Sequence, residues 1–189
     1  MFDGITGWFA AHIMARMNAA AEDEAVSRLN PQRDDKILVI GFGPGLGLQQ
    51  LLTHPVSEVV GVDPSSVMNR MSAKRNRAAL HDRRLRLIEA SVADMQWPEG
   101  VYFDGAIAVH SLQMCRPFDP TAQRLSHLLK PQARFVSITH GWAASKDFGD
   151  EARFATEISD GLRRAGFASV QCGQADAEKG TALLIEAQR

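Results

Sequence analysis

The stretch Lys36–Gly47 reads KILVIGFGPGLG, and it decides the fold. A short apolar run that ends in glycine is typical of a strand buried on both faces of a parallel sheet, so we predict a strand over 36–43. Glycines lack Cβ, which lets the backbone turn sharply and approach a ligand closely. Four of seven consecutive residues are glycine, more than a turn alone requires: Gly41, Gly43, Gly45 and Gly47.

An acidic residue closes the next predicted strand, Glu58–Val62. Asp63 stands 22 positions after Gly41, where a carboxylate would accept hydrogen bonds from both hydroxyls of a ribose. The plainer alternative is an N-terminal cap of the following helix. Ser65 also suits that role, so the two interpretations are compatible for neighbouring residues.

Two classes of cofactor contain a ribose that fits this arrangement: nicotinamide or flavin dinucleotides, and S-adenosylmethionine. The dinucleotide fingerprint requires Gly or Ala at its sixth position, where this chain has Leu46 or Leu48. The glycines recur instead at every second position. This spacing favours S-adenosylmethionine and leaves a nicotinamide-dependent oxidoreductase as an alternative.

Outward from this region, short apolar strands alternate with helices, which indicates an α/β fold with a doubly wound parallel sheet. The last two strands follow each other without a helix and predict an antiparallel hairpin. Helices are expected at 4–29, 46–52, 65–79, 120–129 and 151–165, and further strands at 86–90, 105–109, 134–139, 168–172 and 182–186.

Two segments together resemble small class I S-adenosylmethionine-dependent methyltransferases: KILVIGFGPGLGLQQLL and VVGVDPSSVMNRMSAKRN. The resemblance continues in order through LIEASVADMQWPEG, YFDGAIAVHSLQMC and LSHLLKPQARFV, and covers about 11–139. It implies a Rossmann-like sheet of seven strands in the order 3-2-1-4-5-7-6, with strand 7 antiparallel. It also implies one domain over 1–189, with an N-terminal helical lid segment at 1–30 and the core at 31–189.

The resemblance also implies a cofactor site, residue by residue. The glycine turn would line the methionine and ribose parts, Asp63 would hold the ribose hydroxyls, and the segments after strands 2 and 3 would contact adenine. The end of strand 4, including Ser111, would lie beside the reactive methyl. The implied cofactor-binding residues are Gly41, Phe42, Gly43, Gly45, Asp63, Pro64, Met68, Ser91, Val92, Val109 and His110.

This chain departs from the family pattern at two places. The residue two positions before the first glycine is usually acidic, and here it is Val39. The usual Gly-Asp-Ala after strand 3 is replaced by Ala90-Ser91-Val92, with Asp94 three positions along. The first change removes a carboxylate that would help to hold the cofactor's ammonium group. Both changes motivate a second alternative, a non-catalytic binding or regulatory protein.

The predicted reaction is methyl transfer by direct displacement, with a small molecule as the acceptor. A general base is needed only if the nucleophile must lose a proton. His110, at the end of strand 4, is the first candidate and His140 the second, although a histidine at a strand end is often structural. Residues of the N-terminal segment would cover the pocket as a lid, or pack on the sheet as core: Trp8, Phe9, Met14 and Met17.

Composition narrows the partners and the location. The net charge of −1 gives no long-range attraction to nucleic acid or to an anionic membrane. The basic stretch from Arg70 to Arg86 has no interleaved aromatic residues and fits a solvated face. We expect no metal site, no signal peptide and no membrane span. Two isolated cysteines, Cys115 and Cys172, suit a reducing compartment, so we expect a cytoplasmic protein.

Overall fold

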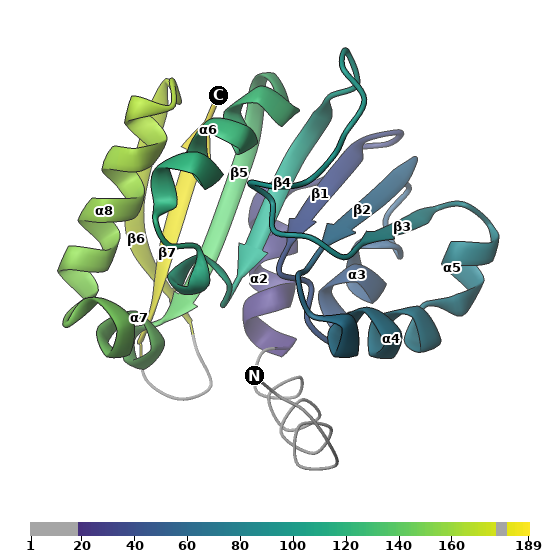
Figure 1. Cartoon of the computed structure of the whole chain (residues 1–189), viewed down its shortest axis with the longest axis horizontal. Helices are drawn as coiled ribbons and strands as arrows, with labels where there is room; N and C mark the ends of the chain where they lie inside the picture. The colour runs from purple at the N-terminus through teal and green to yellow at the C-terminus, as the bar shows by residue number, and fades with distance from the viewer. Residues whose placement is uncertain (1–18, 177–180) are drawn as a thin grey trace.

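The computed structural model describes residues 19–176 and 181–189. Its centre is a seven-stranded sheet with the order β3-β2-β1-β4-β5-β7-β6 (Figure 1). This is the predicted order. The strands are β1 (Lys36–Ile40), β2 (Glu58–Val62), β3 (Leu85–Ile88), β4 (Phe103–Val109), β5 (Leu129–His140), β6 (Ser169–Asp176) and β7 (Thr181–Gln188).

The first five strands run parallel, and β7 is antiparallel to both of its neighbours, β5 and β6. The predicted antiparallel strand 7 and the terminal hairpin are therefore confirmed. Since parallel neighbours point the same way, β1, β2, β3 and β4 all end at one edge of the sheet. A ligand site in such a sheet lies beyond those ends.

Helices cover both faces of the sheet (Figure 1). One core cluster joins α2 and α3 to side chains such as Ile37 and Val39, and the other joins α6 and α8 to Leu38 and Ile40. Alternate residues of β1 thus face opposite layers, which explains its continuous apolar sequence. The helices are α2 (Ala19–Leu29), α3 (Leu46–Leu51), α4 (Ser66–Arg75), α5 (Arg77–His81), α6 (Phe118–Leu128), α7 (Gly141–Phe148) and α8 (Glu151–Arg164).

Some element bounds differ from the sequence prediction. The helix expected at 65–79 divides into α4 and α5 at Asn76, whose side-chain amide is buried and donates to the carbonyl oxygens of Gly45 and Ser72. The sequence did not predict α7 or the short 3₁₀ turn η1 (Leu112–Met114). Of the helix expected at 4–29, the structure describes the part from residue 19, and the four proposed lid residues lie outside the described residues.

Candidate active site

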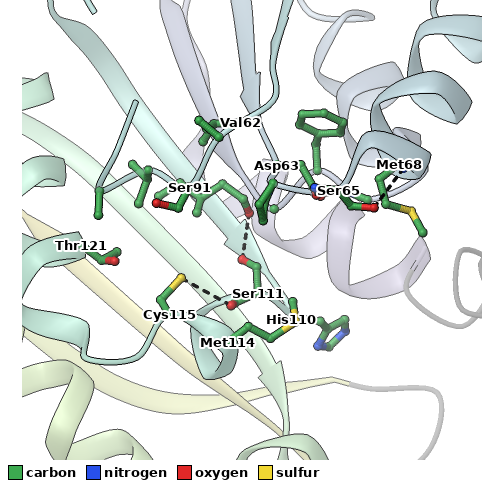
Figure 2. Close-up of a pocket in the computed structure, with 18 of the residues that line it drawn as sticks. Val62, Asp63, Ser65, Met68, Ser91, His110, Ser111, Met114, Cys115 and Thr121 are labelled. Carbon is green, nitrogen blue, oxygen red and sulfur yellow. Dashed lines mark hydrogen bonds between the residues drawn. The ribbon is translucent and has the colours of Figure 1, made fainter. Parts of the chain in front are cut away.

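A cavity of about 570 Å³ lies at the carboxyl ends of β1, β2, β3 and β4. In Figure 2, Asp63 and Ser65 lie on one side of this pocket, with Cys115 and Thr121 across it. Small-molecule sites usually enclose about 300–1,000 Å³. Ten of the predicted cofactor residues line the cavity: Gly41, Phe42, Gly43, Asp63, Pro64, Met68, Ser91, Val92, Val109 and His110.

The glycine turn brings the end of β1 against the end of β4. Gly41 has a φ of 68°, and a Cβ built on it would lie 2.3 Å from Cβ of Ser111. The hydroxyl of Ser111 donates to the carbonyl oxygen of Ile40 over 2.8 Å (Figure 2). A side chain at position 41 would therefore push these two strand ends apart. Glycine at this position allows the two backbones to approach closely.

Gly45, the eleventh predicted residue, does not line the cavity. Its φ is 85°, and an added Cβ would lie 2.4 Å from the hydroxyl oxygen of Ser72 and 2.8 Å from the side-chain nitrogen of Asn76. The absence of a side chain here allows α4 to pack closely against the turn. The position of Gly45 therefore fits a structural role.

Asp63 is nearly buried and firmly held. The backbone N–H of Gly43 donates to one carboxylate oxygen and that of Ser65 to the other, each over 2.9 Å. Burial raises the pKa of Asp63, and these two hydrogen bonds act in the opposite direction. Ser65 itself caps α4 by accepting from the N–H of Met68. The cap predicted for Ser65 is confirmed, which leaves the carboxylate of Asp63 facing the cavity.

The segment after β3 forms another part of the wall. Ser91 and Asp94 line the cavity and bond to each other, with the serine hydroxyl donating to the carboxylate over 2.6 Å. The Asp94 N–H donates back to the hydroxyl oxygen over 3.2 Å. Asp94, offset by three positions in the sequence, thus reaches the same wall as Ser91.

His110 directly follows β4 and stacks on His140, with ring centroids 3.9 Å apart and planes 13° apart. The backbone N–H of His140 donates to Nδ1 of His110 over 3.1 Å, so the neutral His110 ring has its proton on Nε2. Burial, followed by the proximity of His140, lowers the pKa of His110 to about 3. Burial also lowers the pKa of His140.

This arrangement does not fit the general base predicted at His110. One ring nitrogen already accepts a hydrogen bond and the other has a proton, so no lone pair is free to take a proton at neutral pH. The buried Nε2 atom has no hydrogen-bond partner within the described part of the chain. A ring in this state is a hydrogen-bond donor.

Other lining residues were not predicted from the sequence. Met114, Cys115 and Arg116 follow β4, and Thr121 belongs to α6. The Arg116 guanidinium lies 4.4 Å from the ring centroid of Phe148, and burial raises the pKa of the Cys115 thiol. The place of Met114, Cys115 and Arg116 shortly after the end of β4 could have identified them as candidate site residues from the sequence. Glu22, from α2, also lines the cavity and had no sequence signal.

Comparison with known proteins defines the class to which this fold and site belong. A family model described as a methyltransferase domain matches residues 37–132. The chain therefore belongs to this family, the class I S-adenosylmethionine-dependent methyltransferases. This membership supports neither the nicotinamide-dependent nor the non-catalytic alternative.

Particular relatives agree with this class. The chain is 25% identical to the uncharacterized methyltransferase YdaC of Bacillus subtilis (strain 168), over 85% of this chain and 87% of YdaC. It is also 21% identical to 24-methylenesterol C-methyltransferase 3 of Arabidopsis thaliana, over 84% of this chain and 46% of that protein.

Solved structures share the fold at low sequence identity. Phosphoethanolamine N-methyltransferase 2 of Haemonchus contortus, solved with phosphomonomethylethanolamine and S-adenosylhomocysteine, matches with a TM-score of 0.73 at 15% identity. The match covers 89% of this chain and about half, 52%, of that one. A geranyl diphosphate methyltransferase matches with a TM-score of 0.73 at 16% identity, over 92% of this chain and 80% of that one.

The residues around the cavity fit S-adenosylmethionine on three observations. The volume suits a nucleoside with an amino-acid tail. A buried carboxylate, Asp63, faces it from the end of β2, where a ribose diol would bind. The backbone of the glycine turn borders it without intervening side chains at Gly41 and Gly43. Within 19–176 and 181–189, no helix is long and apolar enough to cross a membrane.

Proposed function

We propose that this methyltransferase acts on a small-molecule acceptor by direct displacement. The observation that supports this most strongly is the single continuous cavity that reaches from Asp63 to His110 and on to Met114, Cys115 and Thr121. A cofactor held between the glycine turn and Asp63 would leave the part beside η1 and α6 for the acceptor.

When bound, S-adenosylmethionine supplies a methyl group that is already activated on a sulfonium, so the protein mainly contributes orientation. In our proposal, Gly41, Phe42 and Gly43 border the methionine and ribose parts, and Asp63 accepts from the ribose hydroxyls. Gly45 supports this turn through its packing against α4. Pro64 and Met68 pack on the adenine ring, while Ser91 and Val92 meet its edge.

On the acceptor side, Val109, His110 and Ser111 border the place of transfer. In our proposal His110 shapes this wall of the cavity through its stack on His140, in place of the proton removal predicted from the sequence. An acceptor atom that attacks through its lone pair without first losing a proton needs no base at this position. Three of the named relatives act on, or were solved with, small molecules: a methylenesterol, phosphomonomethylethanolamine and geranyl diphosphate.

Calorimetric titration tests the cofactor half of this proposal. We expect S-adenosylmethionine and S-adenosylhomocysteine to bind with one-to-one stoichiometry and NADH to give no heat of binding. Binding of NADH alone, or no binding of either sulfur compound at millimolar concentration, would exclude the proposal. A cytoplasmic location remains a prediction from the two free cysteines, Cys115 and Cys172.

A further inference from the structure

We propose that Glu22, on α2, is the residue that binds the ammonium group of the cofactor's amino-acid tail. The inference rests on the cofactor site proposed above and names a partner for one of its charges. S-Adenosylmethionine has an ammonium group at the far end from adenine. A cation in an enclosed site needs an anionic partner or several hydrogen-bond acceptors.

The carboxylate of Glu22 lies against Gly47, in the first turn of α3. Glu22 lines the cavity, although it precedes β1 in the sequence and reaches the site from another helix. A Cβ built on Gly47 would lie 1.9 Å from Oε2 of Glu22 and 2.6 Å from its Cδ. The carboxylate therefore occupies the space that a side chain at position 47 would fill. The contact with Glu22 accounts for glycine at position 47, which a turn of the chain alone would not require.

Among the described residues, two other carboxylates line the cavity, and they lie where different parts of the ligand would bind. Asp94 follows β3 and bonds Ser91, and Asp63 follows β2 and bonds the N–H groups of Gly43 and Ser65. Along the sheet edge the order is β3, β2, β1, β4. With adenine near β3 and ribose at Asp63, the amino-acid tail lies toward β1. Within 19–176 and 181–189, Glu22 is the lining carboxylate at that end.

The replacement of an acidic residue by Val39 fits the same arrangement. Val39 is 3% exposed and packs in one apolar cluster with Ala21, Ala25 and Val26 of α2. A carboxylate at position 39 would be buried among these side chains at considerable cost. The helix that covers Val39 provides a carboxylate itself, from a position that reaches the cavity.

Electrostatics add support to this geometry. Burial, with a smaller contribution from Asp23, raises the pKa of Glu22 to about 8. A carboxyl group in such surroundings gains its charged form when a cation arrives. Neighbouring helix α3 has the sequence LGLQQL and provides no charged side chain to satisfy it. The carboxyl group of Glu22 would therefore become charged beside a cationic ligand.

Four compounds that differ only in the tail test this inference by calorimetry. They are S-adenosylhomocysteine, its decarboxylated analogue (ammonium only), its deaminated analogue (carboxylate only) and 5′-methylthioadenosine (neither group). We expect Glu22→Gln to weaken the two ammonium-bearing compounds roughly 10- to 150-fold, as for loss of a charge-assisted hydrogen bond. Affinity for the two compounds without ammonium should change less than about twofold, because the adenosine contacts remain.

Two further variants control for indirect effects. Asp23→Asn removes a charge from the next residue of the same turn, whose carboxylate accepts from the side-chain nitrogen of Gln50. It should weaken none of the four compounds, because the charge of Asp23 acts on Glu22 only by raising its pKa. Gly47→Ala keeps Glu22 but displaces its carboxylate, so it should reproduce the ammonium-specific loss. Thermal melting of each variant confirms that it is folded before titration.

The outcomes separate this inference from the proposed function. Equal weakening of all four compounds in Glu22→Gln, or no weakening of any, overturns the role of Glu22 while the adenosine site stands. If the unmodified protein binds none of the four, the proposed cofactor site itself is wrong and this inference fails with it.

Discussion

The two halves of the candidate active site are built in different ways. At the ends of β1 and β2, the site consists mainly of backbone: the Gly41 and Gly43 turn, and a carboxylate held by two N–H groups. Beyond the end of β4, it consists of side chains from separate elements, among them His110, whose ring stacks on that of His140 behind the cavity lining. Backbone geometry depends on local sequence and is readable from it, whereas side-chain geometry depends on neighbours that only the fold supplies.

The largest loss of stability is expected where the backbone at the end of β1 approaches the end of β4. Gly41→Ala should lower the free energy of unfolding by about 2–5 kcal/mol. The new Cβ would clash with Ser111, and the alanine would have to adopt the positive φ of this position. Gly43→Ala is the matched control, since its φ is 52° but nothing lies within 4 Å of the added Cβ. It should lose only about 1–2 kcal/mol in urea titration. Equal losses would contradict the close approach of β1 and β4.

Asp63 should show the next largest effect, on affinity. Asp63→Asn removes the charge that two ribose hydroxyls would contact, so we expect S-adenosylhomocysteine to bind about 100-fold more weakly. Calorimetry measures the change, and Asp82→Asn is the control because that carboxylate is 63% exposed and outside the cavity. Unchanged affinity in Asp63→Asn would remove the ribose role from this half of the site.

In the histidine half, the expected effect is a pH dependence of stability. The pKa of His110 is about 3 in the folded protein and 6.5 in its ordinary state, so the unfolded chain binds a proton first as the pH falls. The stability contributed by the neutral ring is complete above pH 6.5 and is lost progressively toward pH 3. The loss is at most about 1.4 kcal/mol per pH unit.

Urea titrations at pH 7, 6 and 5 check this sign. The wild-type protein should lose stability with each step, and His110→Asn should lose less. His127→Asn, at an exposed position on α6, should follow the wild type. A steeper loss in His110→Asn than in the wild type would show that the ring is protonated in the folded state and would revive its role as a base.

The smallest effect on affinity is expected at Ser91, after β3, where our proposal places the edge of adenine. Ser91→Ala removes a hydroxyl that bonds Asp94, and should weaken S-adenosylhomocysteine only about 2- to 10-fold, the range of one neutral hydrogen bond. Ser57→Ala, whose hydroxyl donates to the carbonyl oxygen of Asp35 away from the cavity, is the control. A loss as large as that in Asp63→Asn would mean that Ser91 contributes as much to binding as the carboxylate.

Particular elements show how far sequence patterns reach. The strand at 58–62 was predicted to the residue, because two-sided burial leaves a continuous apolar run. The division between α4 and α5 was missed, since it depends on Asn76 turning inward to the carbonyl of Gly45 across the fold. Helix α7 was missed as well. It begins at Gly141 directly after β5, where no cap or break in the sequence marks a new element.

The sequence by itself determined the class of protein. The glycine spacing, Asp63 and the order of strands depend on local backbone conformation, which can be read from the sequence. Tertiary structure alone decided the working state of the site. The tautomer of His110 depends on a backbone N–H thirty residues away at His140, and Glu22 reaches the cavity only because α2 packs against the turn. Protonation and charge pairing follow from burial and distance, and both arise only when separate segments meet in the folded chain.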